Sequence, residues 1–212
     1  MAEINKEFFN VEENFKQNKM EDILTEDEEI LVRLNPNKKV YILEAIFKGL
    51  PLALIWGGLD AFVIVMMVSN GIFDNPYMIW FIIPFFALHL VPVWLYIAGI
   101  VKRVASYKNI EYALTNKRVI IRSGIIGIDF KTLYYSEIQS VNVKVGLFDR
   151  LFKVGDIYIT SVYQSAVLDD VSAPYAYATK IQEVVMDIKT DIEFPNDLRP
   201  ETNHGYRTKY HK

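Results

Sequence analysis

The chain has 212 residues, 51% of them hydrophobic, and a formal net charge of −3. Its length allows one or two domains, and its weakly acidic balance gives no indication of a nucleic-acid partner. The chain contains no cysteine, which excludes disulfide bonds and thiolate chemistry and fits a reducing compartment.

Residues 1–34 form a polar, acidic segment that we predict to be a cytoplasmic N-terminal arm. The segment has no apolar core of the kind found in secretory signals, so we expect no cleaved leader. Thr25 and Glu28 have the spacing of a helix-capping box ahead of the apolar Ile30 and Leu31. This composition fits either a docking segment or a partly ordered, solvated arm.

Two long apolar runs follow: Gly49–Val68, with the single charge Asp60, and Tyr77–Val101, with no Lys, Arg, Asp or Glu. A helix crosses the hydrocarbon core of a bilayer in about 20 residues, so each run is long enough to span. The loop Ser69–Pro76 carries Gly, Asn and Pro, which end one helix and begin the next. We therefore predict a transmembrane hairpin over residues 35–108, with spans at about 49–68 and 77–101.

Positive charges flank both runs on one side only. They are Lys38, Lys39 and Lys48 before the first run, and Lys102, Arg103 and Lys108 after the second. The loop between the runs has neither Lys nor Arg, so the positive-inside rule predicts a multi-pass protein of the cell membrane with both termini in the cytoplasm. Asn35 followed by Pro36 predicts the start of the first long helix.

Small residues recur every fourth position in the first run, at Gly49, Ala53, Gly57 and Ala61. Such a stripe lets two helices approach closely and predicts packing against the second run or against another copy of the chain.

Two ionisable residues, Asp60 and His89, lie at membrane depth in the two runs. Intramembrane ionisable groups are functional candidates, so one hypothesis is a proton or ion pathway in a transport complex. The other hypothesis is a neutral polar pair that holds the hairpin together.

From residue 109 the apolar pattern changes to alternation, which predicts short antiparallel strands in a curled sheet of sandwich or barrel type. The predicted strands are Ile110–Leu114, Arg118–Arg122, Ile126–Tyr134, Ile138–Val145, Ile157–Thr160 and Val167–Val171. A C-terminal helix follows, capped by Ser172 and with an apolar stripe from Tyr177 to Ile188. The predicted fold is an α+β membrane protein with a cytoplasmic domain over residues 109–189 and a flexible tail over 190–212.

The sequence YALTNKRVI at Tyr112–Ile120 resembles the bacterial membrane-anchored pleckstrin-homology-like (PH) family. Further matching pieces follow in order at Gly124, Ile138–Val141, Asp149–Leu151 and Gly155. The resemblance covers about residues 25 to 189. It implies a strongly bent sheet of seven strands capped by one C-terminal helix, so one strand is expected in a segment assigned above as loop.

No catalytic, cofactor-binding or metal-binding motif is recognisable, and we expect a protein that is not an enzyme and needs no cofactor. The three histidines lie in the second apolar run and the tail, which excludes histidine chemistry in the domain. Asp169 and Asp170 are adjacent strand residues that point to opposite faces, and we expect them to be solvated charges. The four large apolar residues of Leu147–Phe152 predict a plug for the core or a contact patch.

The resemblance makes Lys117 and Arg118 candidate lipid contacts, because the turn between the first two strands of PH domains commonly meets lipid phosphates. Lys102 and Arg103 are further candidates at the membrane surface.

The expected function is a non-catalytic PH-like module anchored at the cytoplasmic face of the membrane. Its expected partners are the lipid bilayer and other membrane proteins or a second copy of itself, with no nucleic acid and no small-molecule substrate. Two alternatives remain: a subunit of a transport or proton-linked complex that uses Asp60 and His89, and a sensor of anionic lipid headgroups that uses Lys117 and Arg118.

Overall fold

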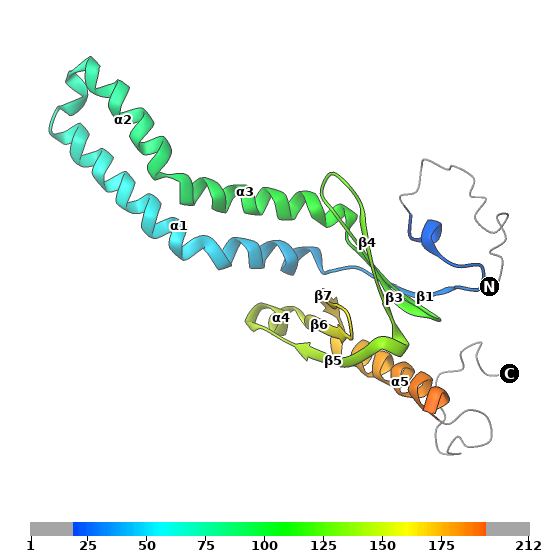
Figure 1. Cartoon of the computed structure of the whole chain (residues 1–212). Helices are drawn as coiled ribbons and strands as arrows, with labels where there is room; N and C mark the ends of the chain where they lie inside the picture. The colour runs from blue at the N-terminus through cyan, green and yellow to red at the C-terminus, as the bar shows by residue number, and fades with distance from the viewer. Residues whose placement is uncertain (1–18, 194–212) are drawn as a thin grey trace, which may run out of the picture.

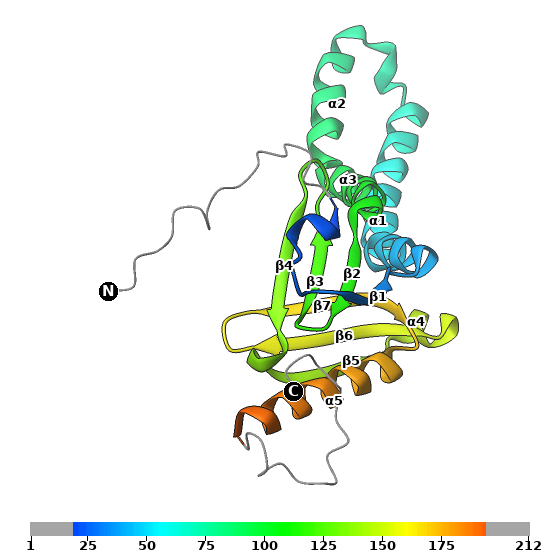
Figure 2. The same ribbon diagram turned by 90° about the vertical axis from the view of Figure 1, so that its right-hand side faces the viewer.

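The computed structural model describes residues 19–193. A long helical extension, formed by α1, α2 and α3, projects from a domain of two antiparallel sheets and a C-terminal helix (Figures 1 and 2). The α+β class is therefore confirmed. The first part of the predicted arm, before Lys19, and the predicted tail after Glu193 lie outside the described residues.

The first sheet has four strands in the order β1-β2-β3-β4, and every neighbouring pair is antiparallel. The strands are β1 (Ile30–Leu34), β2 (Glu111–Thr115), β3 (Arg118–Ser123) and β4 (Asp129–Tyr134). In the register, Val119 lies opposite Leu114 on one side and Leu133 on the other. All three are buried, so their apolar side chains face the core as the period-two pattern predicts.

The second sheet has three antiparallel strands in the order β5-β6-β7. They are β5 (Ile138–Lys144), β6 (Val154–Ser161) and β7 (Ser165–Ser172), with the short helix α4 (Leu147–Phe152) between β5 and β6. Helix α5 (Pro174–Glu193) lies along β5 (Figure 2). Its buried Ile181 and the side-chain bond of Gln182 Nε2 to the Val141 carbonyl, 2.9 Å, attach the helix to this sheet.

One hydrophobic core joins both sheets and α5. Its fully buried members include Val119, Leu133, Ile138, Ile157, Ile159, Leu168 and Ile181. Four short 3₁₀ helices complete the described part of the chain: η2 (Met20–Ile23), η3 (Ile72–Asp74), η4 (Tyr107–Asn109) and η5 (Tyr135–Glu137).

The seventh strand is β1, and it corrects the predicted domain boundary. Residues 30–34 were expected in a separate arm, but they form an edge strand that pairs with β2, with Leu34 opposite Tyr112. Thr25 and Glu28 do not cap a helix; they close a turn, in which the Glu28 amide donates to the Thr25 carbonyl at 2.8 Å. The helical extension is therefore an insertion between the first two strands of the domain.

Helix α1 (Lys38–Ser69) begins two residues after the predicted start. Its N-cap is Asn37, whose side chain accepts hydrogen bonds from the amides of Lys39 and Val40 at 3.1 and 3.5 Å. Within the described residues, α1 is the single helix that is long and apolar enough by itself to cross a membrane. Helices α2 (Pro76–His89) and α3 (Val91–Ser106), the latter extended by η4, meet that criterion only as one pair bent by 51°.

The bend between α2 and α3 lies at Leu90, just before Pro92. Proline has no N–H to donate, and its ring is incompatible with the carbonyl of a preceding helical turn. The break frees the carbonyl of His89, which accepts a hydrogen bond of 2.8 Å from the indole of Trp56 on α1. Pro84 lies inside α2 without ending it.

The small-residue stripe brings α1 close to α3 of the same chain. A Cβ added at Gly49 would overlap the ring of Tyr96 and lie 2.8 Å from its Cε2 atom. The hydroxyl of Tyr96 donates to the carbonyl of Ile46 at 2.7 Å, which fixes the ring over the glycine. Gly57 faces Val93, whereas Ala61 is exposed.

Replacing Gly49 by alanine should destabilise the extension, because the new methyl group must displace the Tyr96 ring and its hydrogen bond. Overpacking of this kind costs about 1–3 kcal/mol. We expect a lower thermal midpoint for the full chain in detergent micelles. Gly58→Ala is the matched control, since nothing lies within 4 Å of a Cβ at that position. Equal midpoints for the two variants would contradict the close contact.

Candidate functional site

The turn between β2 and β3 holds the N-terminal segment. The side chain of Asn116 accepts from the amide of Glu29 at 3.1 Å and donates to the carbonyl of Asp27 at 3.0 Å. The hydroxyl of Thr115 donates to Glu28 Oε1 at 2.8 Å. The motif that carries the family resemblance is thus the part of the sheet that binds the residues before β1.

Arg118 is buried in this turn, and its position does not fit the expected lipid contact. Its Nε and Nη2 atoms donate to the two carboxylate oxygens of Glu28 at 2.9 and 2.8 Å, and Nη2 also donates to the carbonyl of Ile23 at 2.6 Å. The Glu28 side chain has no exposed surface. Lys117 is more exposed, and its Nζ atom donates to the hydroxyl of Thr25 at 3.1 Å.

The Arg118 pair also sets the protonation of Glu28. Burial of the carboxyl disfavours its charged form, but hydrogen bonds from Arg118 and Thr115 outweigh that effect and hold the pKa of Glu28 below its usual 4.5. Glu28 and Arg118 are therefore a charged, doubly hydrogen-bonded pair inside the fold.

Lys102 and Arg103, the other candidate lipid contacts, differ in their surroundings. Lys102 is exposed on α3. The Arg103 guanidinium lies 3.9 Å from the ring centroid of Tyr41, its Nε donates to the Tyr41 carbonyl at 2.9 Å, and its Nη2 lies 3.8 Å from Glu44. Arg103 thus joins α3 to α1 at the base of the extension.

Asp60 and His89 meet across the extension, with Nδ1 of His89 2.7 Å from Oδ1 of Asp60 but without hydrogen-bond alignment. The imidazole lies between two aromatic rings, those of Trp56 and Phe85, with centroids 5.2 and 5.5 Å away. Asp60 is buried, and its Oδ2 atom has no hydrogen-bond partner. The contact joins α1 to the last residue of α2.

Helix α4 does not plug the core. Leu147 and Leu151 are 91% and 75% exposed, because the helix packs on α1 through a stacked Phe148–Phe47 pair whose centroids are 5.0 Å apart. Phe47 lies immediately before the predicted first span. The side of α4 that carries Leu147 and Leu151 is thus an exposed apolar surface beside the start of that span.

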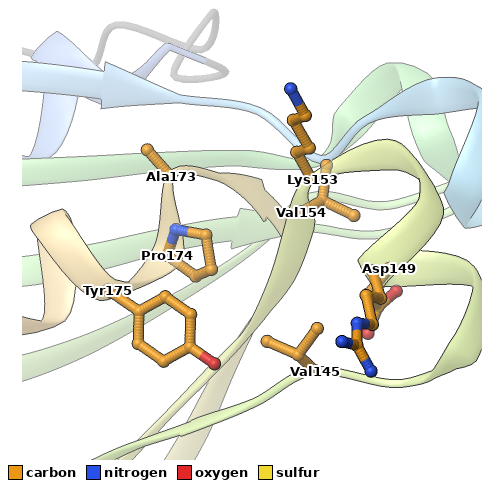
Figure 3. Close-up of a pocket in the computed structure, with 8 residues that line it drawn as sticks. Val145, Asp149, Lys153, Val154, Ala173, Pro174 and Tyr175 are labelled. Atoms are coloured by element: carbon orange, nitrogen blue, oxygen red, sulfur yellow. The ribbon is translucent and has the colours of Figure 1, made fainter.

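An open pocket of about 620 Å³ lies between α4 and the start of α5. Its lining residues are Val145, Asp149, Arg150, Lys153, Val154, Ala173, Pro174 and Tyr175. In Figure 3 the Tyr175 ring and the Val145 side chain are two of the residues that line the pocket, whereas the Lys153 side chain extends away from Tyr175. The pocket combines an apolar wall with the acidic Asp149 and the basic Arg150 and Lys153.

Acidic residues meet at the junction between the extension and the domain, which the sequence did not predict. Glu44 of α1, Asp149 of α4 and Asp170 of β7 each place a carboxylate oxygen within 4.8 Å of the others. Asp156 lies beside them and accepts a hydrogen bond from the amide of Asp170 at 3.0 Å. Asp170 was expected to be solvated, but it is 1% exposed.

Burial dominates the protonation of two of these aspartates. It raises the pKa of Asp170 to about 7, with further contributions from the nearby Glu44, Asp156 and Asp149. It also raises the pKa of Asp169 to about 6, with Asp156 as the second cause. Burial and the neighbouring carboxylates therefore favour the protonated forms of these two aspartates when no cation is bound.

A family model described as "Bacterial PH domain" matches residues 50–187, from within α1 to within α5. No curated protein and no solved structure matches the chain. The matched range excludes β1 and Glu28, although both are parts of the folded domain.

Replacing Glu28 by glutamine should destabilise the domain, because it leaves the Arg118 charge buried without its counter-charge. Breaking such a pair costs about 3–5 kcal/mol. We expect a lower urea midpoint for the full chain in detergent micelles, followed by near-ultraviolet circular dichroism. Glu26→Gln, at an exposed neighbouring position, is the control and should leave the midpoint unchanged.

The same comparison has a pH dependence with a defined sign. Because the pKa of Glu28 is lowered on folding, its contribution to stability is present above about pH 4.5 and is lost as the pH falls through the folded-state pKa. The difference in urea midpoint between the wild type and Glu28→Gln should therefore become smaller below pH 4.5. If this difference stays constant down to pH 3, the charged pair is not its source.

Proposed function

Because the chain belongs to the bacterial PH domain family, we propose that it is a non-catalytic interaction and assembly module anchored in a bacterial cell membrane. In this proposal α1 and the bent α2–α3 pair form a two-span hairpin, and the PH-like domain lies on the cytoplasmic side. The partners are other membrane proteins or a second copy of the chain. The fold alone does not specify such a function, so the argument depends on particular surfaces.

The observation that carries the proposal is the uncovered apolar surface of the inserted extension. Its exposed side chains include Leu52, Leu54, Ile55, Leu59, Phe62 and Val65 on α1, and Trp80, Phe81, Ile83, Leu88 and Leu95 on α2 and α3. Soluble monomers rarely expose contiguous apolar surface on this scale. Lipid chains would cover it, and the backbone polar groups are already satisfied within the helices.

The charge distribution supports the orientation. Between Gly49 and Val101 the sequence has no Lys or Arg, and its acidic residues are Asp60 in the first run and Asp74 in the loop, whereas Lys and Arg gather at the domain end of the extension. The positive-inside rule then assigns the domain to the cytoplasm.

Helix α4 supports close contact between the domain and the lipid surface. Its exposed Leu147 and Leu151 lie beside the start of the first proposed span, and Arg150 and Lys153 supply positive charge next to them. Apolar side chains with adjacent cations are suited to the interfacial layer of an anionic leaflet. This assigns lipid contact to α4 in place of Arg118.

The two other hypotheses have less support. A headgroup sensor at Lys117 and Arg118 would need cations that are free, but the Arg118 guanidinium is neutralised by Glu28. A transport role would need a polar pathway, whereas Asp60 and His89 contact each other next to aromatic rings. We therefore assign Asp60 and His89 to the stability of the hairpin.

The membrane topology can be tested with single cysteines, because the natural chain has none. Ser69→Cys, at the far end of α1, and Ser165→Cys, in the domain, are matched changes at exposed positions. In intact cells we expect an impermeant maleimide to label the cysteine at position 69 and not that at 165 until the cells are opened. Labelling of both or of the second alone would contradict the proposed orientation.

The assembly role can be tested by photo-crosslinking in native membranes. A photoreactive residue at Ile126 or Tyr163, both strongly exposed in turns of the domain, should yield discrete adducts with a membrane protein or with the chain itself. The same probe at Ser69, on the opposite side of the membrane, is the control. A chain that forms no protein adduct from any domain position would contradict an assembly module.

A further inference from the structure

The junction between α1, α4 and β7 has the chemistry of a cation site. Glu44, Asp149 and Asp170 come from three elements that are distant in the sequence, and one carboxylate oxygen of each lies within 4.8 Å of the other two. The convergence therefore results from the fold and not from a local acidic run.

Two of these side chains are buried with unused acceptors. Asp170 is 1% exposed, and neither of its carboxylate oxygens has a hydrogen-bond partner. Asp149 is 2% exposed; its Oδ2 atom accepts from the Gly146 amide at 2.7 Å, while its Oδ1 atom has no partner. Buried polar groups in proteins are nearly always paired, so these free oxygens point to a missing ligand.

A cation would satisfy these oxygens. Among the described side chains, the cation that contacts this group is Arg103, whose Nη2 atom is 3.8 Å from Glu44 and whose guanidinium is already held against Tyr41. With Asp156 next to Asp170, four carboxylates share the charge of Arg103. The further cations are Lys48, near Glu44, and Lys144, near Asp156.

We propose that Glu44, Asp149 and Asp170 bind a hard divalent cation that links the helical extension to the PH-like domain. Oxygen-only carboxylate ligands select ions of the Ca²⁺, Mg²⁺ and Mn²⁺ class over zinc or copper. Two ligands of one ion are separated by at most twice the metal–oxygen distance, about 5 Å for Ca²⁺ and about 4 Å for Mg²⁺. The three oxygens lie within 4.8 Å of one another, a separation that one Ca²⁺ ion can bridge.

Such an ion would hold the extension and the domain together. Glu44 belongs to the extension, whereas Asp149 and Asp170 belong to the domain, so binding stabilises one orientation of the domain relative to α1. This inference does not depend on the membrane partner and goes beyond the assembly role proposed above.

The test uses the full chain in detergent micelles after removal of metals with EDTA. Isothermal titration with CaCl₂ and, separately, MgCl₂ should show saturable binding of one ion per chain, and the bound ion should raise the thermal midpoint. Binding of either ion supports the site. If neither ion binds saturably, the proposal is overturned and the carboxylates are neutralised by protons alone.

Asp170→Asn is the decisive variant. Asn tolerates the positive φ of 52° at this position, and loss of one charge relieves repulsion, so the variant should fold and be at least as stable in EDTA. Its affinity for the ion should fall at least tenfold, and so should that of Glu44→Gln, which changes a partly exposed ligand. Asp129→Asn, exposed on β4, is the charge-matched control. Unchanged affinity in both ligand variants would overturn the assignment.

Discussion

The pairing of β1 with β2 determines where both ends of the helical extension leave the domain. Leu34 and Tyr112 are register partners, so the chain enters α1 and returns from α3 at neighbouring points of one sheet. Side chains reinforce this junction: the Tyr41 and Ser106 hydroxyls are 3.3 Å apart, and the Tyr107 hydroxyl donates to the Pro36 carbonyl at 3.3 Å. The short connection after Val101 is helical, so the domain is attached at two points and does not hang from a flexible linker.

Because the domain is attached at two points, its position does not depend on surface charges. Arg118 belongs to the interior, where it binds a carboxylate 90 positions away in the sequence and fixes the segment that leads into β1. Because that segment precedes the extension, the Glu28–Arg118 pair stabilises the entry of α1 as well as the sheet. In the function proposed above, contact with a membrane surface is assigned to α4, which packs on α1 through Phe148 and Phe47.

Sequence periodicity was sufficient to predict the elements whose partners lie close to them in the sequence. The alternating strands of Glu111–Ser123, the strand β5 and the apolar stripe of α5 are close to their predicted positions. Strand β1 was missed because its partner follows the whole extension, so no local pattern relates the two, and the Thr25–Glu28 spacing resembles a helix cap. The exposed apolar surface of α4 was one of the two alternatives for Leu147–Phe152. The grouping of Glu44, Asp149 and Asp170 was missed for the same reason as β1, because it depends on α1 packing against α4 and β7.

Two groups of buried ionisable side chains in the described part of the chain have opposite charge balances. Glu28 and Arg118 remove each other's charge, and neighbouring groups use their remaining donors and acceptors, so burial is compensated where the pair lies. Asp149 and Asp170 are buried to a similar degree but retain acceptors that no donor satisfies. At the junction, unlike at Glu28, no described donor satisfies either oxygen of Asp170 or the Oδ1 atom of Asp149. The imbalance is explained if a positively charged ligand binds at the junction. Because the junction lies between α1 and the domain, such a ligand would stabilise one orientation of the two parts.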